Sequence, residues 1–436
     1  MTNLEIGFVG TGAMLVLLIL RVPIGATLGI VAVGGIWVIR GPRAALGSLG
    51  TLPYEFCASW TLSAVPMFLL LGAVAYHMGL TKGLYEAARA WMGRLPGGLA
   101  IASNWACTLF GAASGSSVAT TAAMGKLAIP EMLRLGYHPA LATGAVAAAG
   151  TIDALIPPSI AFVIYGWYAE APIDKLLIAG ILPGLLTAFA YMFFIMLICR
   201  LNPALAPTVH LRYSLREKVG LLKDVWPLPL LILGVVGALW SGAATSTEAA
   251  AFGAAMALVI ALIRRSITRE ALRSSFGETA KNMSALFFVV VGAVLFTRFL
   301  AVSGLPAFIA TQLTALGSKF LIILFMLVIY LILGMLLDPI GVMLITLPVL
   351  VPVCRQNGID LIWIGVLVVK LVEVGMLTPP VGFHCFVLKA VVGDKVPLPM
   401  IFRGACWFIA ADAIGHLIRT RCVGAAAEHH ADTADQ

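Results

Sequence analysis

Charged side chains are scarce in this sequence. Asp, Glu, Lys and Arg make up only 11% of the 436 residues, whereas 61% are hydrophobic. The mean hydropathy is +1.02. A water-soluble domain of this length would need far more charge on its surface. The composition therefore excludes a soluble protein and predicts an integral membrane protein in a lipid bilayer.

The cysteine and histidine residues do not indicate a disulfide framework, a metal site or a catalytic site. The seven cysteines are scattered, with no paired spacing for a disulfide framework or a metal site. His77 and His384 stand alone, and no set of His, Cys and carboxylate residues has a consistent spacing. The sequence thus predicts no metal centre of this kind, and it lacks the catalytic cluster that an integral-membrane enzyme would need.

The net charge of +8 does not indicate a nucleic-acid partner, because the basic residues lie in short loops between apolar runs. They cluster within 82–94, 200–223 and 264–273. Loops rich in Lys and Arg remain in the cytoplasm. We therefore expect these three segments on the cytoplasmic face.

Two stretches that lie 222 residues apart share one pattern of proline and glycine. Pro130, Gly136 and Pro157-Pro158 recur as Pro352, Gly358 and Pro379-Pro380. Proline removes a backbone donor and clashes with the preceding turn, so each copy predicts a buried helix that breaks at its double proline. Paired interrupted helices in the two halves of a chain indicate the binding site of a secondary transporter.

Apolar runs of about 20 residues predict membrane spans. They lie near 5–20, 22–39, 57–78, 138–168, 176–199, 225–240, 243–263, 284–302, 360–392 and 398–418. Two further stretches, 97–132 and 319–353, have a small or polar break in the middle, which predicts two re-entrant helical hairpins.

Five predicted spans separate the two hairpins, so the second hairpin is expected to enter from the opposite face. The predicted fold is an all-α membrane protein with an inverted repeat, two re-entrant hairpins and two broken helices. Its parts are scaffold spans (1–80), first-repeat transport elements (81–199), a cytoplasmic loop with scaffold spans (200–302), second-repeat transport elements with the last span (303–418) and a tail (419–436).

The first hairpin tip places hydroxyl groups at membrane depth. Ser114, Ser116 and Ser117 are followed by Thr120. Hydroxyl and carbonyl oxygens can coordinate a cation such as Na⁺, and free N–H groups at the next half-helix favour an anion. The alternative is that Ser and Gly only allow close helix packing; the adjacent repeat favours the binding site.

The two breaks differ in one position. Asp153 precedes the first double proline, and a carboxylate there could bind a cation or carry a proton. Gly375 and Thr378 precede the second. In the second hairpin tip, Asp338 before Pro339 is favoured as a helix cap over a direct ion ligand.

Other charged residues in the spans are expected to be structural. Lys370 and Glu373 lie three residues apart and are expected to pair with each other. Asp412 is expected near a span end, within reach of water.

Several long motifs, in the same order, resemble the large membrane subunit of tripartite ATP-independent periplasmic (TRAP) transporters. The likeness covers nearly the whole chain. The motifs are Gly111-Ala-Ala-Ser-Gly-Ser-Ser-Val-Ala-Thr120, Ile129-Pro130, Leu135-Gly-Tyr137, Ala148-Ala-Gly-Thr151, Ile156-Pro-Pro-Ser159, Leu333-Gly-Met-Leu-Leu-Asp-Pro339, Ile345-Thr-Leu-Pro348 and Glu373-Val-Gly-Met-Leu-Thr-Pro-Pro-Val-Gly382.

The resemblance implies a Na⁺-coupled importer of organic acids, often C4-dicarboxylates or sialic acid, that moves its substrate by an elevator motion. It implies a multi-pass protein of the bacterial inner membrane. It also implies two partners, a small four-helix membrane subunit and a periplasmic substrate-binding protein.

The resemblance further implies two Na⁺ sites with the substrate between the hairpin tips. The first site would use Ser114, Ser116, Asp153, Ile156 and Pro158; the second would use Gly334, Gly375, Thr378 and Pro380; and the substrate would meet Ser116, Ser117, Thr120, Asp338 and Pro339.

This chain departs from the family pattern at Asp153, where the family usually has Gly. Asp153 could block the backbone path, add a ligand or alter the choice of ion. Two alternative functions remain open: an ion-coupled anion transporter that works without a binding protein, and a channel. An inverted repeat within a single chain argues against the channel.

Overall fold

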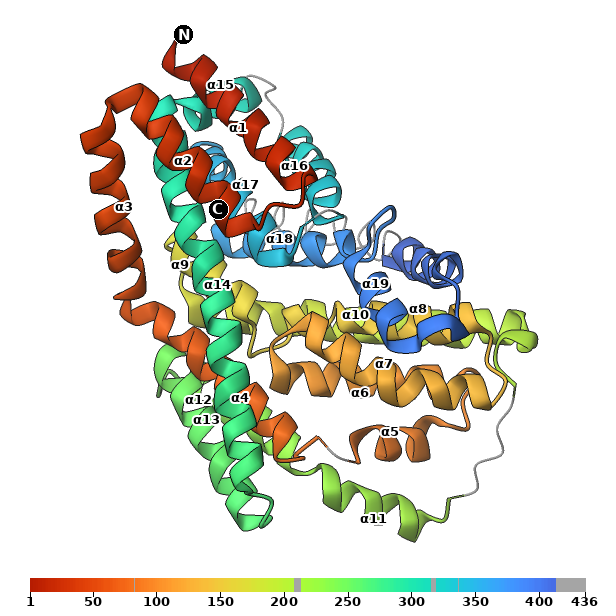
Figure 1. Cartoon of the computed structure of the whole chain (residues 1–436). Helices are drawn as coiled ribbons and strands as arrows, with labels where there is room; N and C mark the ends of the chain where they lie inside the picture. Colours follow the sequence, from red (N-terminus) through yellow and green to blue (C-terminus); the bar gives the residue numbers. More distant parts are fainter. Residues whose placement is uncertain (82, 208–212, 315–318, 336, 413–436) are drawn as a thin grey trace, which may run out of the picture.

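The computed structural model describes residues 1–81, 83–207, 213–314, 319–335 and 337–412, and this part of the chain is helical with no strand (Figure 1). Helices α1–α4 pack against helices from much later in the chain: α14 contacts all four, α13 contacts α4, and α12 packs on α13. Their bounds are α1 Asn3–Ile19, α2 Ile24–Arg40, α3 Pro42–Cys57, α4 Ala64–His77, α12 Pro227–Trp240, α13 Ser246–Ile263 and α14 Arg269–Ser303.

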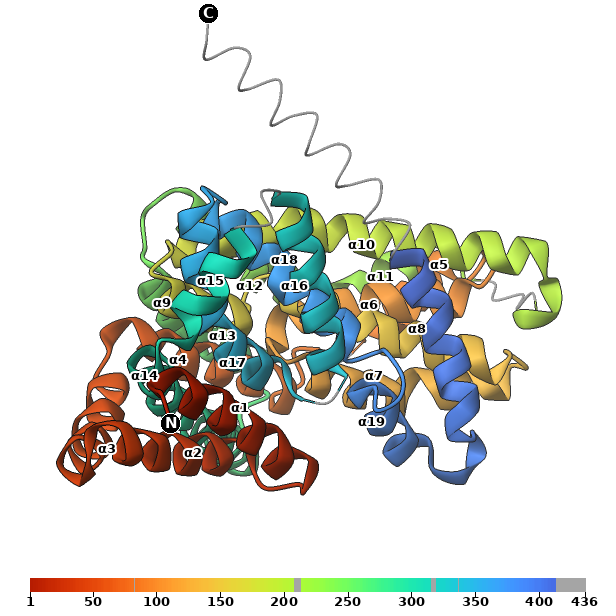
Figure 2. The same ribbon diagram turned by 90° about the horizontal axis from the view of Figure 1, so that it is seen from above.

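The long helix α14 packs along α2, α3 and α4. Glycines allow this close approach: a Cβ atom at Gly292 would overlap the carbonyl oxygen of Gly25, and one at Gly25 would lie 2.6 Å from the carbonyl oxygen of Phe288. Small residues bring membrane helices into backbone contact in this way. Figure 2 shows α1–α3 gathered on one side of the molecule, away from α7, α8 and α19.

The predicted repeat is present in the helix boundaries. The first copy comprises α6 Gly98–Ser114, α7 Ser117–Arg134, α8 Pro139–Gly150, α9 Ile160–Ala169 and α10 Ile173–Leu201. The second comprises α16 Lys319–Gly334, α17 Pro339–Gln356, α18 Leu361–Gly375, α19 Phe383–Val392 and a helix over 398–412. The starts of α7 and α17, and those of α8 and α18, are 222 residues apart.

Both predicted helix breaks are confirmed. Helix α8 ends at Gly150 and α9 begins at Ile160, with a bend of 43° between the two segments. Helix α18 ends at Gly375 and α19 begins at Phe383. Both double prolines contain a cis peptide bond.

The two hairpin turns are capped at equivalent positions. Ser116 is the N-cap of α7 and accepts a hydrogen bond from the amide of Ala119. Its counterpart Asp338 caps α17, with the amides of Ile340 and Gly341 each donating to its carboxylate at 3.2 Å. The predicted capping role of Asp338 is therefore confirmed.

Some helices were not expected from the sequence. Helices α5 Leu84–Met92 and α11 Leu215–Val225 lie within the basic segments predicted as loops, and α15 Leu305–Thr314 connects α14 to the second repeat. Each is too short for a span, and α11 starts at a Ser214–Glu217 capping box. The unexpected α3 contains Pro53, and α14 starts at Arg269 rather than near 284. Short 3₁₀ turns cover η1 Trp60–Ser63, η2 Asp153–Leu155, η3 Pro203–Leu205 and η4 Gly393–Lys395.

Among the described residues, five helices are long and apolar enough to span a membrane, and two bent pairs could raise this number to seven. Several predicted spans correspond to shorter apolar helices, α1 and α2 among them. The last predicted span, 398–418, is helical as far as 412; its final residues and the predicted tail, 419–436, lie outside the described residues.

Lys370 and Asp412 form a buried ion pair. The Nζ atom of Lys370 lies 3.0 Å from Oδ2 of Asp412, and the side chains are only 2% and 7% exposed. The hydroxyl of Tyr191 on α10 donates to the same carboxylate oxygen at 2.5 Å. The expected pairing of Lys370 with Glu373 is therefore wrong, as is the expected contact of Asp412 with water. The helix over 398–412 brings Asp412 against α18, whereas Glu373 faces the first hairpin.

Replacing Asp412 with Ala should lower the free energy of unfolding by about 3–5 kcal/mol, because Lys370 would remain buried without its counter-charge. The double variant Lys370→Met, Asp412→Asn should recover most of this loss, since it removes both charges and leaves an acceptor for Tyr191. Thermal unfolding of the detergent-solubilised protein would measure both effects. A single variant that unfolds at the wild-type temperature would contradict the structural role of the pair.

The second hairpin and the second broken helix contact each other at two glycines, Gly334 and Gly375. A Cβ atom added at Gly375 would lie 2.8 Å from the Cα atom of Gly334 and 3.2 Å from the carbonyl oxygen of Tyr330. Helices α16 and α18 are thus in backbone contact, and no side chain fits between them at this point.

Gly375→Ala should therefore destabilise the protein by roughly 1–3 kcal/mol, because overpacking forces the two backbones apart. Gly237→Ala on α12 is the matched control, since a Cβ atom there meets nothing within 4 Å. Thermal unfolding of the two variants side by side provides the comparison. Equal stability of the two variants would show that α16 and α18 accommodate the added methyl group without loss of stability.

Candidate functional site

A cavity of about 570 Å³ lies between the two hairpin tips. The first tip lines it with residues 115–119 and Ala122, and the second with Asp338, Pro339 and Ile340. The first break contributes Ala154 and residues 159–161, and the second broken helix contributes Glu373 and Phe383. Leu69 on α4 and several residues of α14, among them Glu278 and Asn282, complete the wall. This central cavity occupies the place where the family resemblance puts the substrate.

Four helix N-termini converge on the central cavity. Its lining includes the first residues of α7, α9, α17 and α19, which are Ser117, Ile160, Pro339 and Phe383. The first N–H groups of a helix have no partner within the helix, and the helix dipole places partial positive charge there. These four half-helices start at the breaks and hairpin turns. At α17 the carboxylate of Asp338 already accepts from the first amides, so the starts of α7, α9 and α19 provide the anion-attracting surface.

The charged side chains of the central cavity are all acidic. Glu278, Asp338 and Glu373 line it, and its described lining contains no Lys, Arg or His. Asp338 is engaged as the cap of α17, and Glu278 pairs with His77 at 2.6 Å. Glu373 accepts from Ser117 at 3.1 Å. The side chains thus favour cations, whereas the helix N-termini favour anions.

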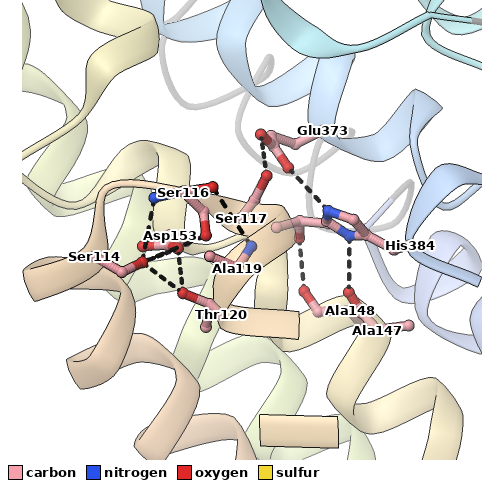
Figure 3. A network of polar contacts seen from close by, with 11 residues as sticks. Ser114, Ser116, Ser117, Ala119, Thr120, Ala147, Ala148, Asp153, Glu373 and His384 are labelled. Carbon is pink, nitrogen blue, oxygen red and sulfur yellow. Dashed lines mark hydrogen bonds and ion pairs between the residues drawn. The ribbon is translucent and has the colours of Figure 1, made fainter. Parts of the chain in front are cut away.

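Asp153 forms a buried cluster with hydroxyl groups of the first hairpin (Figure 3). Its Oδ2 atom accepts from the hydroxyl of Thr120 at 2.6 Å and from that of Ser114 at 3.2 Å. Asp153 is completely buried, and its Oδ1 atom has no hydrogen-bond partner in the described part of the chain. A Cβ atom at Gly111 would overlap this oxygen, so the carboxylate fits only because Gly111 has no side chain.

Four members of the predicted first Na⁺ site are close together. A Cβ atom at Gly115, which lies between Ser114 and Ser116, would be 3.0 Å from the carbonyl oxygen of Pro158. The amide of Ile156, the fifth member, donates to the Asp153 carbonyl at 3.3 Å. This set offers oxygen atoms and one buried carboxylate, the donors that suit a hard cation such as Na⁺. Within the described residues, no three His, Cys, Asp or Glu side chains could hold a metal ion.

The predicted second Na⁺ site has no acidic side chain. Gly334 and Gly375 touch, and the amide of Thr378 donates to the Gly375 carbonyl at 2.9 Å. The Thr378 hydroxyl donates to the Val374 carbonyl at 2.8 Å, and Pro380 follows in the same break. Backbone carbonyls and one hydroxyl also fit Na⁺. The two sets are nevertheless unequal, because Asp153 occupies the position equivalent to Gly375.

The predicted substrate contacts separate into two groups. Ser116, Ser117, Asp338 and Pro339 line the central cavity. Thr120 does not line it and belongs instead to the Asp153 cluster. A direct contact between Thr120 and the substrate is therefore not favoured by this geometry.

Glu373 and His384 of the second broken helix make contacts that the sequence did not predict. The Oε2 atom of Glu373 lies 4.0 Å from Nε2 of His384, whose Nδ1 lies 3.3 Å from the Ala147 carbonyl (Figure 3). Together with the Ser117 hydrogen bond, these contacts join α7 and α8 of the first copy to α18 and α19 of the second. Glu278 and Asn282 were missed entirely, because no motif marks them and only folding brings α14 to the cavity.

A family profile described as "Tripartite ATP-independent periplasmic transporter, DctM component" matches residues 11–421. The chain is 39% identical over 363 residues to the C4-dicarboxylate TRAP transporter large permease protein DctM of Pseudomonas aeruginosa, covering 82% of this chain and 83% of that protein. It is 32% identical over 406 residues to the isethionate TRAP transporter permease protein DctMQ of Oleidesulfovibrio alaskensis, covering 89% of this chain and 62% of that protein. Both relatives are named as transport proteins and neither as an enzyme.

The fold is also similar to that of a solved membrane transporter, YdaH of Alcanivorax borkumensis. The TM-score is 0.57 with 15% sequence identity, over 85% of this chain and 86% of that one. At this identity the likeness concerns the fold alone. The family profile and the first relative, by contrast, cover most of the chain. The chain therefore belongs to the DctM family, the large permease subunits of tripartite ATP-independent periplasmic transporters in the bacterial inner membrane.

Proposed function

We propose that this subunit imports a small organic anion together with Na⁺, and that the anion binds in the central cavity. The observation that carries this proposal is the convergence of helix N-termini on one cavity between the hairpin tips, because those of α7, α9 and α19 have no acidic cap. Such N-termini bind carboxylate or other anionic groups without needing a basic side chain.

The acidic lining supports cotransport with a cation. An anion that enters the central cavity meets Glu278, Asp338 and Glu373 and no basic side chain of the described lining. Placing several negative charges in a low-dielectric site is costly unless positive charge accompanies them. Na⁺ bound at the two oxygen-rich sets would supply this charge beside the hairpin tips. Anion and cation would then bind cooperatively, which is the basis of symport.

The family description supports two partners, and the names of the relatives indicate which substrate to test first. A tripartite system would join this chain to a small four-helix membrane subunit and a periplasmic binding protein. The Pseudomonas relative is named for C4-dicarboxylates and the Oleidesulfovibrio relative for isethionate. We take a C4-dicarboxylate as the first substrate to test, because its named transporter is 39% identical to this chain.

An elevator motion is consistent with the arrangement of the helices. The hairpins and broken helices α6–α9 and α16–α19 carry nearly all residues of the proposed sites, whereas α14 and α4 contribute the opposite wall of the central cavity. A substrate held between these two groups would cross the membrane if one group slid against the other.

Labelled succinate should enter proteoliposomes that contain this chain and its small partner subunit when the binding protein is outside. Removing the inward Na⁺ gradient should reduce the initial uptake rate by about 10-fold or more, because cation and anion binding are coupled. Omitting the binding protein should abolish uptake. Transport that ignores both the Na⁺ gradient and the binding protein would refute the proposed function; transport that needs only Na⁺ would favour a carrier that works without a binding protein.

Asp153→Gly should raise the Na⁺ concentration for half-maximal uptake by about 10-fold, because it removes a buried carboxylate from the first oxygen-rich set. Asp153→Asn separates charge from shape, since it retains hydrogen bonding to Ser114 and Thr120. Asp174→Asn, on an acid outside both sets, is the control. An unchanged Na⁺ titration for both Asp153 variants would make this residue structural.

A further inference from the structure

A second, smaller cavity of about 190 Å³ adjoins the central one. The two share Leu69, Ser116, Ala119, Ala122, Glu278 and Asn282 in their linings. The smaller cavity therefore continues from the central cavity along helix α7, between this helix, α4 and α14. We refer to it as the side cavity.

Lys126 is the only basic side chain in the described lining of either cavity. Lys126 is exposed, and its amino group makes no hydrogen bond or ion pair with the described residues. Ser116 caps the start of α7, and Ala119, Ala122 and Lys126 follow at the three- and four-residue spacing that places side chains on one helix face. The amino group is thus available to a molecule in the side cavity.

Lys126 lies further along α7 than the helix N-termini that line the central cavity. It lies nine positions after Ser117, the first residue of α7. At 1.5 Å per residue this corresponds to about 14 Å along the helix axis. A lysine side chain leans toward the N-terminus of its helix, which in α7 is the side of the central cavity. Lys126 can therefore meet an anion that has left the N-termini without blocking the central cavity.

The side cavity extends toward the end of the molecule that the basic loops mark as cytoplasmic. Further along α7, Glu131 pairs with Arg89 of α5 at 3.0 Å, and α5 lies in the basic segment 82–94. By the positive-inside rule this end faces the cytoplasm. A substrate that moves from the central cavity past Lys126 thus moves toward the side of release.

The negative charge of Glu278 opposes the passage of an anion from the central cavity into the side cavity. Glu278 lines both cavities, and its Oε2 atom lies 2.6 Å from Nε2 of His77 on α4. An anion that passes Glu278 experiences repulsion, which a nearby ammonium group offsets. Lysine suits a transient contact, because its ammonium group is a strongly hydrated point charge on a flexible stem.

We infer that Lys126 is a second docking point for the organic anion, on the cytoplasmic side of the central cavity, which receives the anionic group of the substrate during release. This inference rests on the proposed import of an organic anion. It assigns to Lys126 a role in affinity for internal substrate, whereas affinity for substrate delivered from outside depends on the central cavity.

The test measures inhibition of uptake by internal substrate. Proteoliposomes with the complete transporter are loaded with graded unlabelled succinate, and labelled succinate and the binding protein are supplied outside. Only molecules whose periplasmic face points outward then contribute to uptake. Lys126→Gln should raise the internal concentration that halves the uptake rate by about 10-fold, because a charged contact is lost. The KM for external succinate should remain near the wild-type value, and Lys126→Arg should restore the internal affinity.

Lys175→Gln is the matched control, since Lys175 is an exposed lysine at the start of α10 that lines neither cavity. The inference is overturned if Lys126→Gln leaves the internal affinity unchanged, or if it alters the external KM by the same factor. A wild-type transporter that takes up no succinate contradicts the proposed function itself. Thermal unfolding of the Gln and Arg variants separates a folding defect from a loss of docking.

Discussion

The need to satisfy backbone hydrogen bonds at membrane depth determines much of this structure. Two helices break at double prolines and two hairpins turn at Ser116 and Asp338, so several peptide groups lack helical partners far from water. Hydrocarbon cannot satisfy such groups. They must therefore face protein, water or a bound ion, and the surrounding helices enclose them. The same breaks expose the helix N-termini that give the central cavity its anion-attracting character.

Opposite electrostatic preferences meet in this cavity. In the proposed mechanism, helix N-termini attract the substrate anion, whereas the carboxylates of Glu278, Asp338 and Glu373 repel it. A site with only basic side chains would hold a carboxylate firmly whether or not Na⁺ was present. As we propose, a site that binds the anion weakly on its own makes anion binding depend on the accompanying cation, and this dependence would couple the two fluxes.

Much of the local structure could be predicted from the sequence. Proline breaks, the offset between the two copies and the cap at Asp338 all follow from local backbone chemistry, and each is confirmed in the helix boundaries. Contacts between distant elements could not be predicted. The spacing on α18 predicted that Lys370 pairs with Glu373. The actual partner of Lys370 is Asp412, 42 residues later, and that of Glu373 is Ser117, 256 residues earlier. Glu278 likewise joins the cavity only through tertiary packing. The inversion of the repeat and the identity of the ions remain predictions.

The shared oxygen of Asp412 has a mechanical consequence. One carboxylate accepts from Lys370 on α18 and from Tyr191 on α10, so three helices from both copies of the repeat meet at a single buried point. Separating α18 from the helix over 398–412 would leave two buried charges without partners, and moving α10 away would remove the hydrogen bond that Tyr191 donates to the same carboxylate. Helix α10, the broken helix α18 and the helix over 398–412 should therefore move as one rigid body, and any hinge must lie elsewhere in the chain.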